Sequence, residues 1–509
     1  MSDSAVDHTD FSPPARRLTR LLVIAGVLVL LAAGVAAVVW LPPRLACDGP
    51  GSGVVERDGE CIGVTDGGPA FLPGGGEGLR ERYRAVQERI EAENDRVADE
   101  ESSAVKVALL STLSATPDGP LSPEQVLHSL HGAHVAQMRA NHTRELGDPA
   151  PQIQLYLANA GSGHDQWEPV VDELVGMTDD RAPLVAVVGL GPSVEATREA
   201  AERLSAEDVP MVSSVASATG LRHAEIPGLV RVTPGNTDFV AALHAYVGER
   251  DMLDTAMLVH DESPPDLHVK SLTDAFTRTF AEELAGHAPQ PFQGRSVSED
   301  VAYTYFDAVV RNLCAAEADM ALFSGRTVDL REFLDALHVR PCLDEPVSVL
   351  FVETGPVIPP EEVEKLRESR VTVVHASAAD PAWSDEERAA GPVPEGYAPF
   401  EAAFRARLSE VTDVEAALQD GYAAAHHDAV MVAVRALRLT HSGEDGQAPS
   451  AARTARALFL LNEDNTVAGA SGTLSYSTSR GGDPGRKPVP VLEIPARGPA
   501  PELYVTPAL

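Results

Sequence analysis

The chain has 509 residues and a formal net charge of -36, because 76 Asp and Glu residues outnumber 40 Lys and Arg residues. An excess of negative charge disfavours nucleic acid and anionic lipid as partners, since phosphate contacts need clustered Lys and Arg. A hydrophobic content of 44% excludes wholesale disorder, and the length is enough for two or three domains.

Residues 21–41, LLVIAGVLVLLAAGVAAVVWL, form an uncharged apolar run that is long enough to cross a bilayer as a helix. Arg16, Arg17 and Arg20 precede this run, which predicts a cytoplasmic tail over residues 1–20 and an extracytoplasmic chain after residue 41. The expected protein is therefore a single-pass protein of the cell membrane. The alternative is cleavage or lipidation at Cys47, although Arg44 stands where a lipobox has an aliphatic residue.

The chain has four cysteines, Cys47, Cys61, Cys314 and Cys342, which allow three disulfide connectivities. Cys47–Cys61 and Cys314–Cys342 are the favoured pairs, because each closes a short loop and the expected compartment is oxidising. Four free buried thiols are the alternative. Because the sequence has no CxxC motif, it gives no support for redox catalysis or for a zinc knuckle.

Residues 42–101 are expected to form an extracytoplasmic stalk with a Cys47/Cys61 loop and an amphipathic helix. In the segment EGLRERYRAVQERIEAENDRVADE, the apolar residues fall on one helical face: Leu79, Tyr83, Val86, Ile90 and Val97. This pattern favours a helix that docks on the domain behind it, whereas a coiled-coil stalk would need more heptads.

From Val105 onward, short apolar runs alternate with amphipathic helical patterns. Examples of the strand pattern are VKVALLS, IQLYLAN, PLVAVVG, TAMLVHD, ADMALFS, VSVLFVE and RVTVVHA. Such alternation predicts an α/β fold with doubly wound parallel sheets, and the number of units predicts two lobes. Near the C-terminus, the segment GTLSYSTSRGGDPGRKPVPVLEI has a Gly/Asp turn between two alternating runs, which predicts a β-hairpin.

The segment VVGLGPS, residues 187–193, has the order of a nucleotide-binding loop: a strand, then glycines, then a helix. A dinucleotide fingerprint needs a third glycine where Val194 stands, and Pro192 removes one N–H donor, so we reject a nucleotide site. Adjacent His426, His427 and Asp428 point about 100° apart on a helix, which disfavours a metal site. No GxSxG, HExxH or Walker A motif occurs, so neither an enzyme nor a cofactor is expected.

The order of four stretches resembles the type I periplasmic binding proteins, in particular the leucine/isoleucine/valine-binding branch of ABC-transporter substrate-binding proteins. The stretches are VALLSTLSATPDGPLSPEQVLHSLHGAHVA, VAVVGLGPSVEATREAAERLSAEDVPMVSSVASATGL, GLVRVTPGNTDFVAALHAYV with the segment that follows it, and ASGTLSYSTSRGGDPGRKPVPVLEI. The resemblance implies a two-lobed domain over residues 102–509. The first lobe would hold residues 103–235 and 380–465, and the second lobe residues 236–379 and 466–509.

The resemblance also implies a ligand between the lobes, with its carboxylate held by loops of the first lobe. The residues that match the family's positions are Ser114, Ser193, Ala216 through its backbone, Ser217 and the neighbouring Thr219. For Ser193, a helix N-cap is the alternative role.

On the second lobe, Glu353 lies one residue from the position where the family has an acidic partner for the ligand's ammonium group. Arg326 stands where the family often has a tyrosine, which favours a different anion or no ligand.

Two functions follow as hypotheses. The first is a membrane-anchored, extracytoplasmic protein that binds a small polar solute, amino-acid-like or another carboxylate, for an ABC permease or for sensing. The second is a degenerate binding fold that acts as a protein-interaction or structural domain at the cell surface.

Overall fold

The computed structural model describes residues 47, 53–68, 70–100, 104–250, 253–263, 266–294, 306–355, 358–359, 362–385, 389, 391–408, 413–441, 448–497 and 501–509. The expected cytoplasmic tail and the expected membrane helix at residues 21–41 lie outside this set. Within it, no helix combines the length and the hydropathy needed to cross a membrane.

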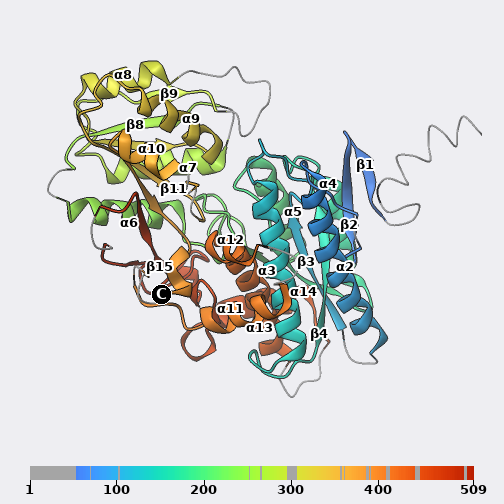
Figure 1. Ribbon diagram of the computed structural model, residues 1–509. Coiled ribbons are helices and arrows are strands. Elements are labelled where there is room, and N and C mark those ends of the chain that lie inside the picture. The colour runs from blue at the N-terminus through green and yellow to red at the C-terminus, as the bar shows by residue number, and fades with distance from the viewer. Residues whose placement is uncertain are drawn as a thin grey trace, which may run out of the picture.

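The described residues form two α/β lobes, one blue and cyan, the other green and yellow, and the orange helices α11–α14 lie beside the first lobe (Figure 1). The first lobe contains a seven-stranded sheet of order β1-β2-β4-β3-β5-β6-β7. Its strands are β1 Val55–Arg57, β2 Glu60–Thr65, β3 Ala104–Ser111, β4 Gln152–Asn159, β5 Leu184–Gly189, β6 Met211–Ser213 and β7 Leu229–Arg231. The strands from β3 to β7 are parallel, as the alternation of strands and helices predicts, whereas β2 pairs antiparallel with β4.

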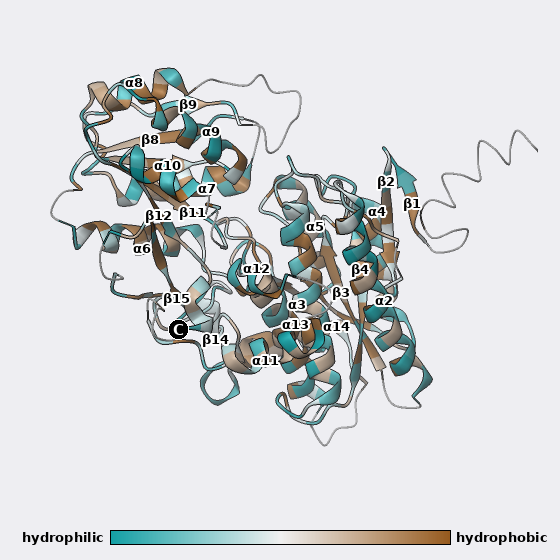
Figure 2. Cartoon of the chain, viewed as in Figure 1, coloured by the Kyte–Doolittle hydropathy of each residue, from teal (hydrophilic) through white to brown (hydrophobic). Residues whose placement is uncertain are grey.

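Helices cover both faces of this sheet: α2 Glu77–Asp99, α3 Pro123–His142, α4 Trp167–Gly176, α5 Glu195–Ala206, α13 Tyr422–His441 and α14 Ala451–Ala457. Figure 2 shows β3 and β4 as largely hydrophobic and α2 as largely hydrophilic, in keeping with strands buried on both faces and a helix on the surface. Helices α3 and α13 pack closely at Gly132, where an added Cβ would lie 2.0 Å from the Ala423 carbonyl oxygen. Glycine at this position therefore permits the contact.

Residues 53–100, which the sequence analysis assigns to a stalk, extend the first lobe. Strand β2 pairs with the edge of β4, and α2 packs against α3 and β4. The face of α2 formed by Leu79, Tyr83, Val86, Ile90 and Val97 is buried, so the expected docking of this helix is confirmed.

The second lobe contains a six-stranded sheet of order β16-β12-β11-β10-β8-β9 among the described residues. Its strands are β8 Ala256–Asp261, β9 Gln290–Phe292, β10 Met320–Ser324, β11 Val347–Val352, β12 Val371–Ala376 and β16 Val491–Ile494. Its helices are α6 Asn236–Gly248, α7 Leu267–Thr279, α8 Asp307–Ala315, α9 Thr327–His338 and α10 Val363–Glu368. All of these strands are parallel except β16, which runs antiparallel to β12.

The chain returns from β12 through the short helix η3 (Pro381–Ser384), α11 (Tyr397–Leu408) and α12 (Val414–Gln419) to α13 in the first lobe.

The predicted C-terminal hairpin is wrong. Strand β14 (Gly472–Leu474) pairs with β13 (Val467–Gly469), β15 (Pro488–Val489) pairs with β17 (Tyr504–Val505), and β16 pairs with β12. The alternation marks strands correctly, but an open edge of the second sheet, distant in sequence, supplies the partner of β16.

Both favoured disulfides are confirmed. Cys47 is bonded to Cys61 of β2, and Cys314 of α8 is bonded to Cys342, which follows α9. The alternative of free thiols is therefore wrong.

Candidate functional site

A small polar cavity lies where the two lobes meet. The first lobe and the segment before α3 contribute Leu121, Pro192, Ser193, Val215 and Ser217; the second lobe contributes Phe239, His268, Arg326, Val352, Glu353 and Thr354; α13 contributes Tyr422. We call this the interlobe cavity. Its volume is about 20 Å³, close to the space that a single water molecule needs. The lobes are therefore closed on each other at this point.

Ser193 and Ser217 come from the loops that follow the parallel strands β5 and β6, and the carboxyl ends of such strands form the ligand crevice in open α/β sheets. Gly189 and Gly191 have φ of 86° and 71°, and at Gly191 an added Cβ would lie 3.2 Å from the His164 ring. The turn that presents Ser193 therefore needs glycine for its backbone conformation and for its close packing.

The hydroxyl of Ser193 accepts hydrogen bonds from the backbone N–H groups of Ser217 (3.0 Å) and Ala218 (3.3 Å). Helix α5 begins after Val194, with no side-chain cap. The alternative role of Ser193 as a helix N-cap is therefore wrong. Since its oxygen accepts both bonds, its hydroxyl proton remains available to a ligand oxygen.

Arg326 lies at the N-terminus of α9 and is buried against Asp266, the N-cap of α7. Its Nε and Nη2 donate to the two carboxylate oxygens of Asp266 at 2.7 and 2.9 Å, and Nη2 also lies 3.4 Å from the carbonyl oxygen of Ser193. Burial raises the pKa of Asp266, but the Arg326 guanidinium outweighs burial and holds that pKa below its ordinary value. Arg326 is thus a paired cation that touches both lobes.

Glu353 follows β11 and faces α13. Its carboxylate accepts from Tyr422 Oη at 3.0 Å, from Thr327 Oγ1 at 3.2 Å and from the backbone N–H of Thr354 at 2.9 Å. Burial, reinforced by Glu353, raises the pKa of Tyr422 well above its ordinary value, so the phenol stays protonated and donates. The carboxylate is held in place by neutral donors, and no described residue forms a salt bridge with it.

His268, in the first turn of α7, connects the lobes. Its backbone N–H donates to the carbonyl of Ser193 at 3.1 Å, and its Nδ1 lies 3.1 Å from Ser217 Oγ. Burial and then the Arg326 guanidinium lower the pKa of His268 to about 4. The imidazole is therefore neutral at physiological pH.

The expected binding residues Ser193, Ser217, Arg326 and Glu353 meet in the interlobe cavity, whereas Ser114, Ala216 and Thr219 do not line it. Ser114 donates to the Glu60 carboxylate and accepts from Asn159 at 3.0 Å. The backbone N–H of Ala216 is engaged by Ser213 Oγ at 3.2 Å. Thr219 bonds across the lobes to Ser271, with 2.9 Å between the hydroxyl oxygens.

Sequence reasoning missed Asp266, His268 and Tyr422. A signal existed for Asp266, because an Asp directly before an amphipathic run is a typical N-cap. Tyr422 is the first residue of α13. No sequence pattern marks His268, whose position depends on the contact between the lobes.

The charges of Arg326 and Asp266 cancel in their ion pair, and the Glu353 carboxylate is the remaining charged group at the cavity. Hydroxyl and backbone groups of the first lobe face this charge across the cavity. The arrangement suits a small ligand that carries an acceptor at the Ser193 end and a cation at the Glu353 end.

The structure is similar to that of a leucine-binding protein of Thermotoga maritima, with a TM-score of 0.55 and 16% identity over 79% of this chain and 99% of that chain. It is equally similar to the branched-chain amino acid transporter substrate-binding protein LivJ of Streptococcus pneumoniae in complex with isoleucine, with a TM-score of 0.55, 16% identity and the same coverage.

An ABC-transporter solute-binding protein of R. palustris in complex with 4-hydroxybenzoate gives a TM-score of 0.57 and 15% identity, over 79% of this chain and 97% of that chain. No protein-family model and no curated protein matches the sequence. The shared architecture nevertheless identifies the fold: the chain has the type I periplasmic-binding fold, two α/β lobes with a cavity between them.

Proposed function

We propose that this protein binds a small polar solute between its lobes and that ligand binding controls how the lobes close. One observation carries the proposal: polar groups from both lobes converge on one cavity. Ser193 and Ser217 face Arg326, Glu353 and His268 there. A ligand that touches both sides holds the two lobes together around itself, because it gains contacts that fully separated lobes lack.

An amino-acid-like ligand fits the polarity of the cavity. Its carboxylate would accept from the hydroxyl of Ser193, and its ammonium group would pair with Glu353, which already accepts from Tyr422 at 3.0 Å. Arg326 is occupied by Asp266 at 2.7 Å, so it positions the cavity wall instead of holding the ligand's anion. Similar structures were solved in complex with leucine, isoleucine or 4-hydroxybenzoate, which supports a small carboxylate as the ligand class.

The closed cavity of about 20 Å³ is too small for such a ligand. Binding therefore requires the contacts of His268 with Ser193 and Ser217 to separate and the ligand to replace them. Ligand pockets for small molecules measure about 300–1,000 Å³, which sets the scale of the opening.

Anchoring in the cell membrane, with the lobes outside the cell, is also part of the proposal. The apolar run at residues 21–41 and the preceding arginines support it. The two disulfides among the described residues support an oxidising compartment. An ABC permease or a membrane sensor is the partner that a surface-held solute-binding protein would serve.

A protein-interaction or structural role is the second candidate. The direct contacts between the lobes favour it, since Ser217 and His268 satisfy each other at 3.1 Å and Arg326 is neutralised by Asp266. In this role the closed arrangement would be permanent and the cavity would hold only water.

Thermal unfolding of the full chain in a mild detergent distinguishes the two candidates. The panel holds the common amino acids, their amides, and aromatic carboxylates such as 4-hydroxybenzoate. A ligand at 100 times its dissociation constant stabilises the folded state by about 2.7 kcal/mol, which raises the melting temperature visibly. A shift with at least one compound is expected for solute binding, and no shift across the panel would favour the second candidate.

A further inference from the structure

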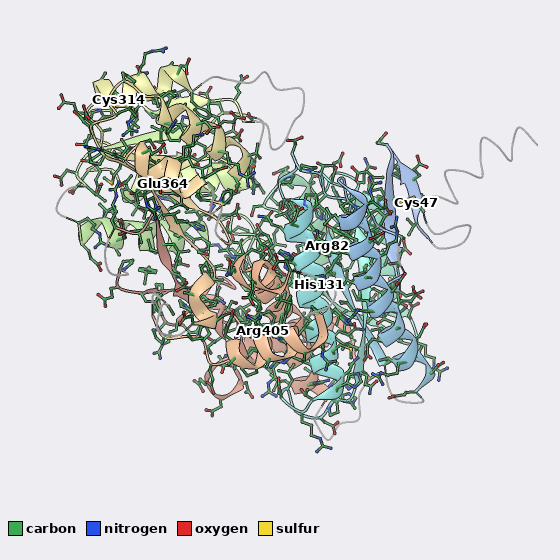
Figure 3. The ribbon with its side chains drawn as sticks, viewed as in Figure 1. Cys47, Arg82, His131, Cys314, Glu364 and Arg405 are labelled. Atoms are coloured by element: carbon green, nitrogen blue, oxygen red, sulfur yellow. A yellow bond between two sulfur atoms is a disulfide. The ribbon has the colours of Figure 1, made fainter. Side chains whose placement is uncertain are left out.

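Three helices of the first lobe enclose a second groove, which shares no residue with the interlobe cavity. It lies between α2, α3 and α11, whose relative positions can be followed in Figure 3 from the labelled Arg82, His131 and Arg405. The lining residues are Arg89, Ala92, Glu93, His134, Met138, Ala406 and Arg407. The groove measures about 540 Å³, within the range of small-molecule sites, and we call it the α2–α3–α11 groove.

Two arginines give this groove its charge. Arg89 Nη1 donates to the carbonyl oxygen of Arg407 at 2.6 Å, which joins α2 to the end of α11 and brings the two residues together. Among the residues that the structure describes, neither guanidinium forms an ion pair. In a chain with a net charge of -36, two such cations at one groove form a local positive site.

The carboxylate in the lining does not cancel this charge. Glu93 is buried and binds Arg96 at 2.6 Å, Asn141 Nδ2 at 2.8 Å and His142 Nε2 at 3.1 Å. Burial raises the pKa of Glu93, but these donors outweigh it and lower the pKa to about 2. The negative charge of Glu93 is thus already balanced by Arg96, so the guanidinium groups of Arg89 and Arg407 are available to bind an anion.

His134 supplies a buried polar group at the same groove; only 4% of its surface is exposed. Its Nδ1 lies 3.3 Å from Gln137 Oε1. Gln137 Nε2 donates to Asn94 Oδ1, so Gln137 Oε1 is an acceptor and Nδ1 carries the imidazole proton. Nε2 has no hydrogen-bond partner among the described residues.

We propose that the α2–α3–α11 groove binds a small organic anion, whose carboxylate or phosphate group lies between the guanidiniums of Arg89 and Arg407 and beside His134. Guanidinium groups recognise both anions through paired N–H donors. The apolar side chains of Ala92, Met138 and Ala406 would contact the rest of the ligand.

Proton uptake should accompany binding. Burial lowers the pKa of His134 to about 4, and Arg89 and Arg407 add to this effect, although the hydrogen bond to Gln137 and the Glu93 carboxylate oppose it. An anion between the two guanidiniums removes their repulsion of the imidazolium. The bound state therefore favours a protonated His134 that donates from Nε2 to the anion.

Calorimetric titration of the full chain with inorganic phosphate and, separately, with succinate tests this site at constant ionic strength. If only phosphate binds saturably, the ligand carries a phosphate group; if only succinate does, it carries a carboxylate. If both bind, the groove recognises either anion. Arg407→Gln should weaken the binding about tenfold or more, because it removes charge-assisted hydrogen bonds. Arg311→Gln, which removes the same charge from the exposed side of α8, should change the affinity less than about twofold.

Three results would overturn the proposal: no saturable binding of either anion, an Arg407→Gln affinity equal to that of Arg311→Gln, or binding without proton uptake. Proton uptake is measured near pH 6.5 by repeating the titration in two buffers of different ionisation enthalpy. Ser193→Ala, in the interlobe cavity, should leave unchanged the phosphate binding that depends on Arg407. A failure of this site is therefore distinguishable from a failure of the proposed solute binding.

Discussion

The guanidinium of Arg326 binds both carboxylate oxygens of Asp266, at 2.7 and 2.9 Å, and its Nη2 lies 3.4 Å from the carbonyl oxygen of Ser193 in the opposite lobe. Asp266 also accepts from the backbone N–H groups of His268 and Val269 at the start of α7. One buried ion pair therefore fixes the beginnings of two helices and one side of the interlobe cavity.

Asp266→Asn should destabilise the protein by about 3–5 kcal/mol, because it leaves the Arg326 guanidinium buried without its counter-charge. Asparagine keeps the capping function, so the loss reports the charge pair. Denaturant unfolding of the full chain measures the effect. Asp335→Asn is the control: Asp335 is 62% exposed and pairs with Lys365, and its loss should cost under about 1 kcal/mol. Equal stability of the two variants would show that the buried pair is dispensable.

Asn94→Ala should destabilise the first lobe by about 1–3 kcal/mol, because the substitution leaves buried backbone groups of β4 without partners. Asn94 Oδ1 accepts from the backbone N–H of Leu155 at 2.8 Å, and Nδ2 donates to the carbonyl of the same residue at 2.8 Å. Asp95→Ala, at the adjacent exposed position of α2, should stay within about 0.5 kcal/mol of the wild type. Matching unfolding midpoints for the two variants would argue that α2 is not an integral part of the lobe.

Stability should fall as the pH drops below 6.5. Burial lowers the pKa to about 4 in several histidines: His134, His164, His268, His375 and His426. Because the unfolded pKa is about 6.5, the unfolded chain binds more protons between these values. These neutral imidazoles stabilise the folded state fully above pH 6.5, and this contribution is lost as the pH falls toward 4. At pH 5 the free energy of unfolding is lower by about 2 kcal/mol for each histidine than at neutral pH. His128 has the opposite sign: burial lowers its pKa, but Asp420 outweighs burial and raises it.

Denaturant midpoints between pH 7.5 and 4.5 test this dependence. His268→Gln should flatten the curve of midpoint against pH, since it removes one buried group whose pKa is lowered to about 4. A midpoint that stays constant from pH 7.5 to 5 would contradict the assignment of neutral buried imidazoles.

The lobes were predictable from the sequence because parallel strands that are buried on both faces read as apolar runs. VKVALLS and PLVAVVG lie in β3 and β5, which are adjacent strands of the first sheet. The loops after β5 and β6 bring Ser193 to the backbone N–H of Ser217, as strand ends on one sheet edge require. The two disulfides were also predictable, because each joins cysteines that are close in the sequence and so closes a short loop.

Features that depend on contacts between distant segments were not predictable. The strand at Val491–Ile494 pairs with β12, more than a hundred residues earlier in the chain, and not with its neighbour in sequence. His268 meets Ser217 only because the lobes close, and no local pattern records that contact. Likewise, nothing near β2 in the sequence indicates that this strand extends the sheet at β4.

Solute binding between the lobes is tested most directly by calorimetric titration of the full chain with the compound that gives the largest thermal shift. The account predicts saturable binding at one site, weakened about tenfold or more by Ser193→Ala, because the substitution removes a hydrogen bond to the ligand's charged group. Ser205→Ala is the control, since its hydroxyl donates to the Pro227 carbonyl at an exposed position. Binding that is equally strong in the wild type, Ser193→Ala and Ser205→Ala would contradict a ligand site in the interlobe cavity.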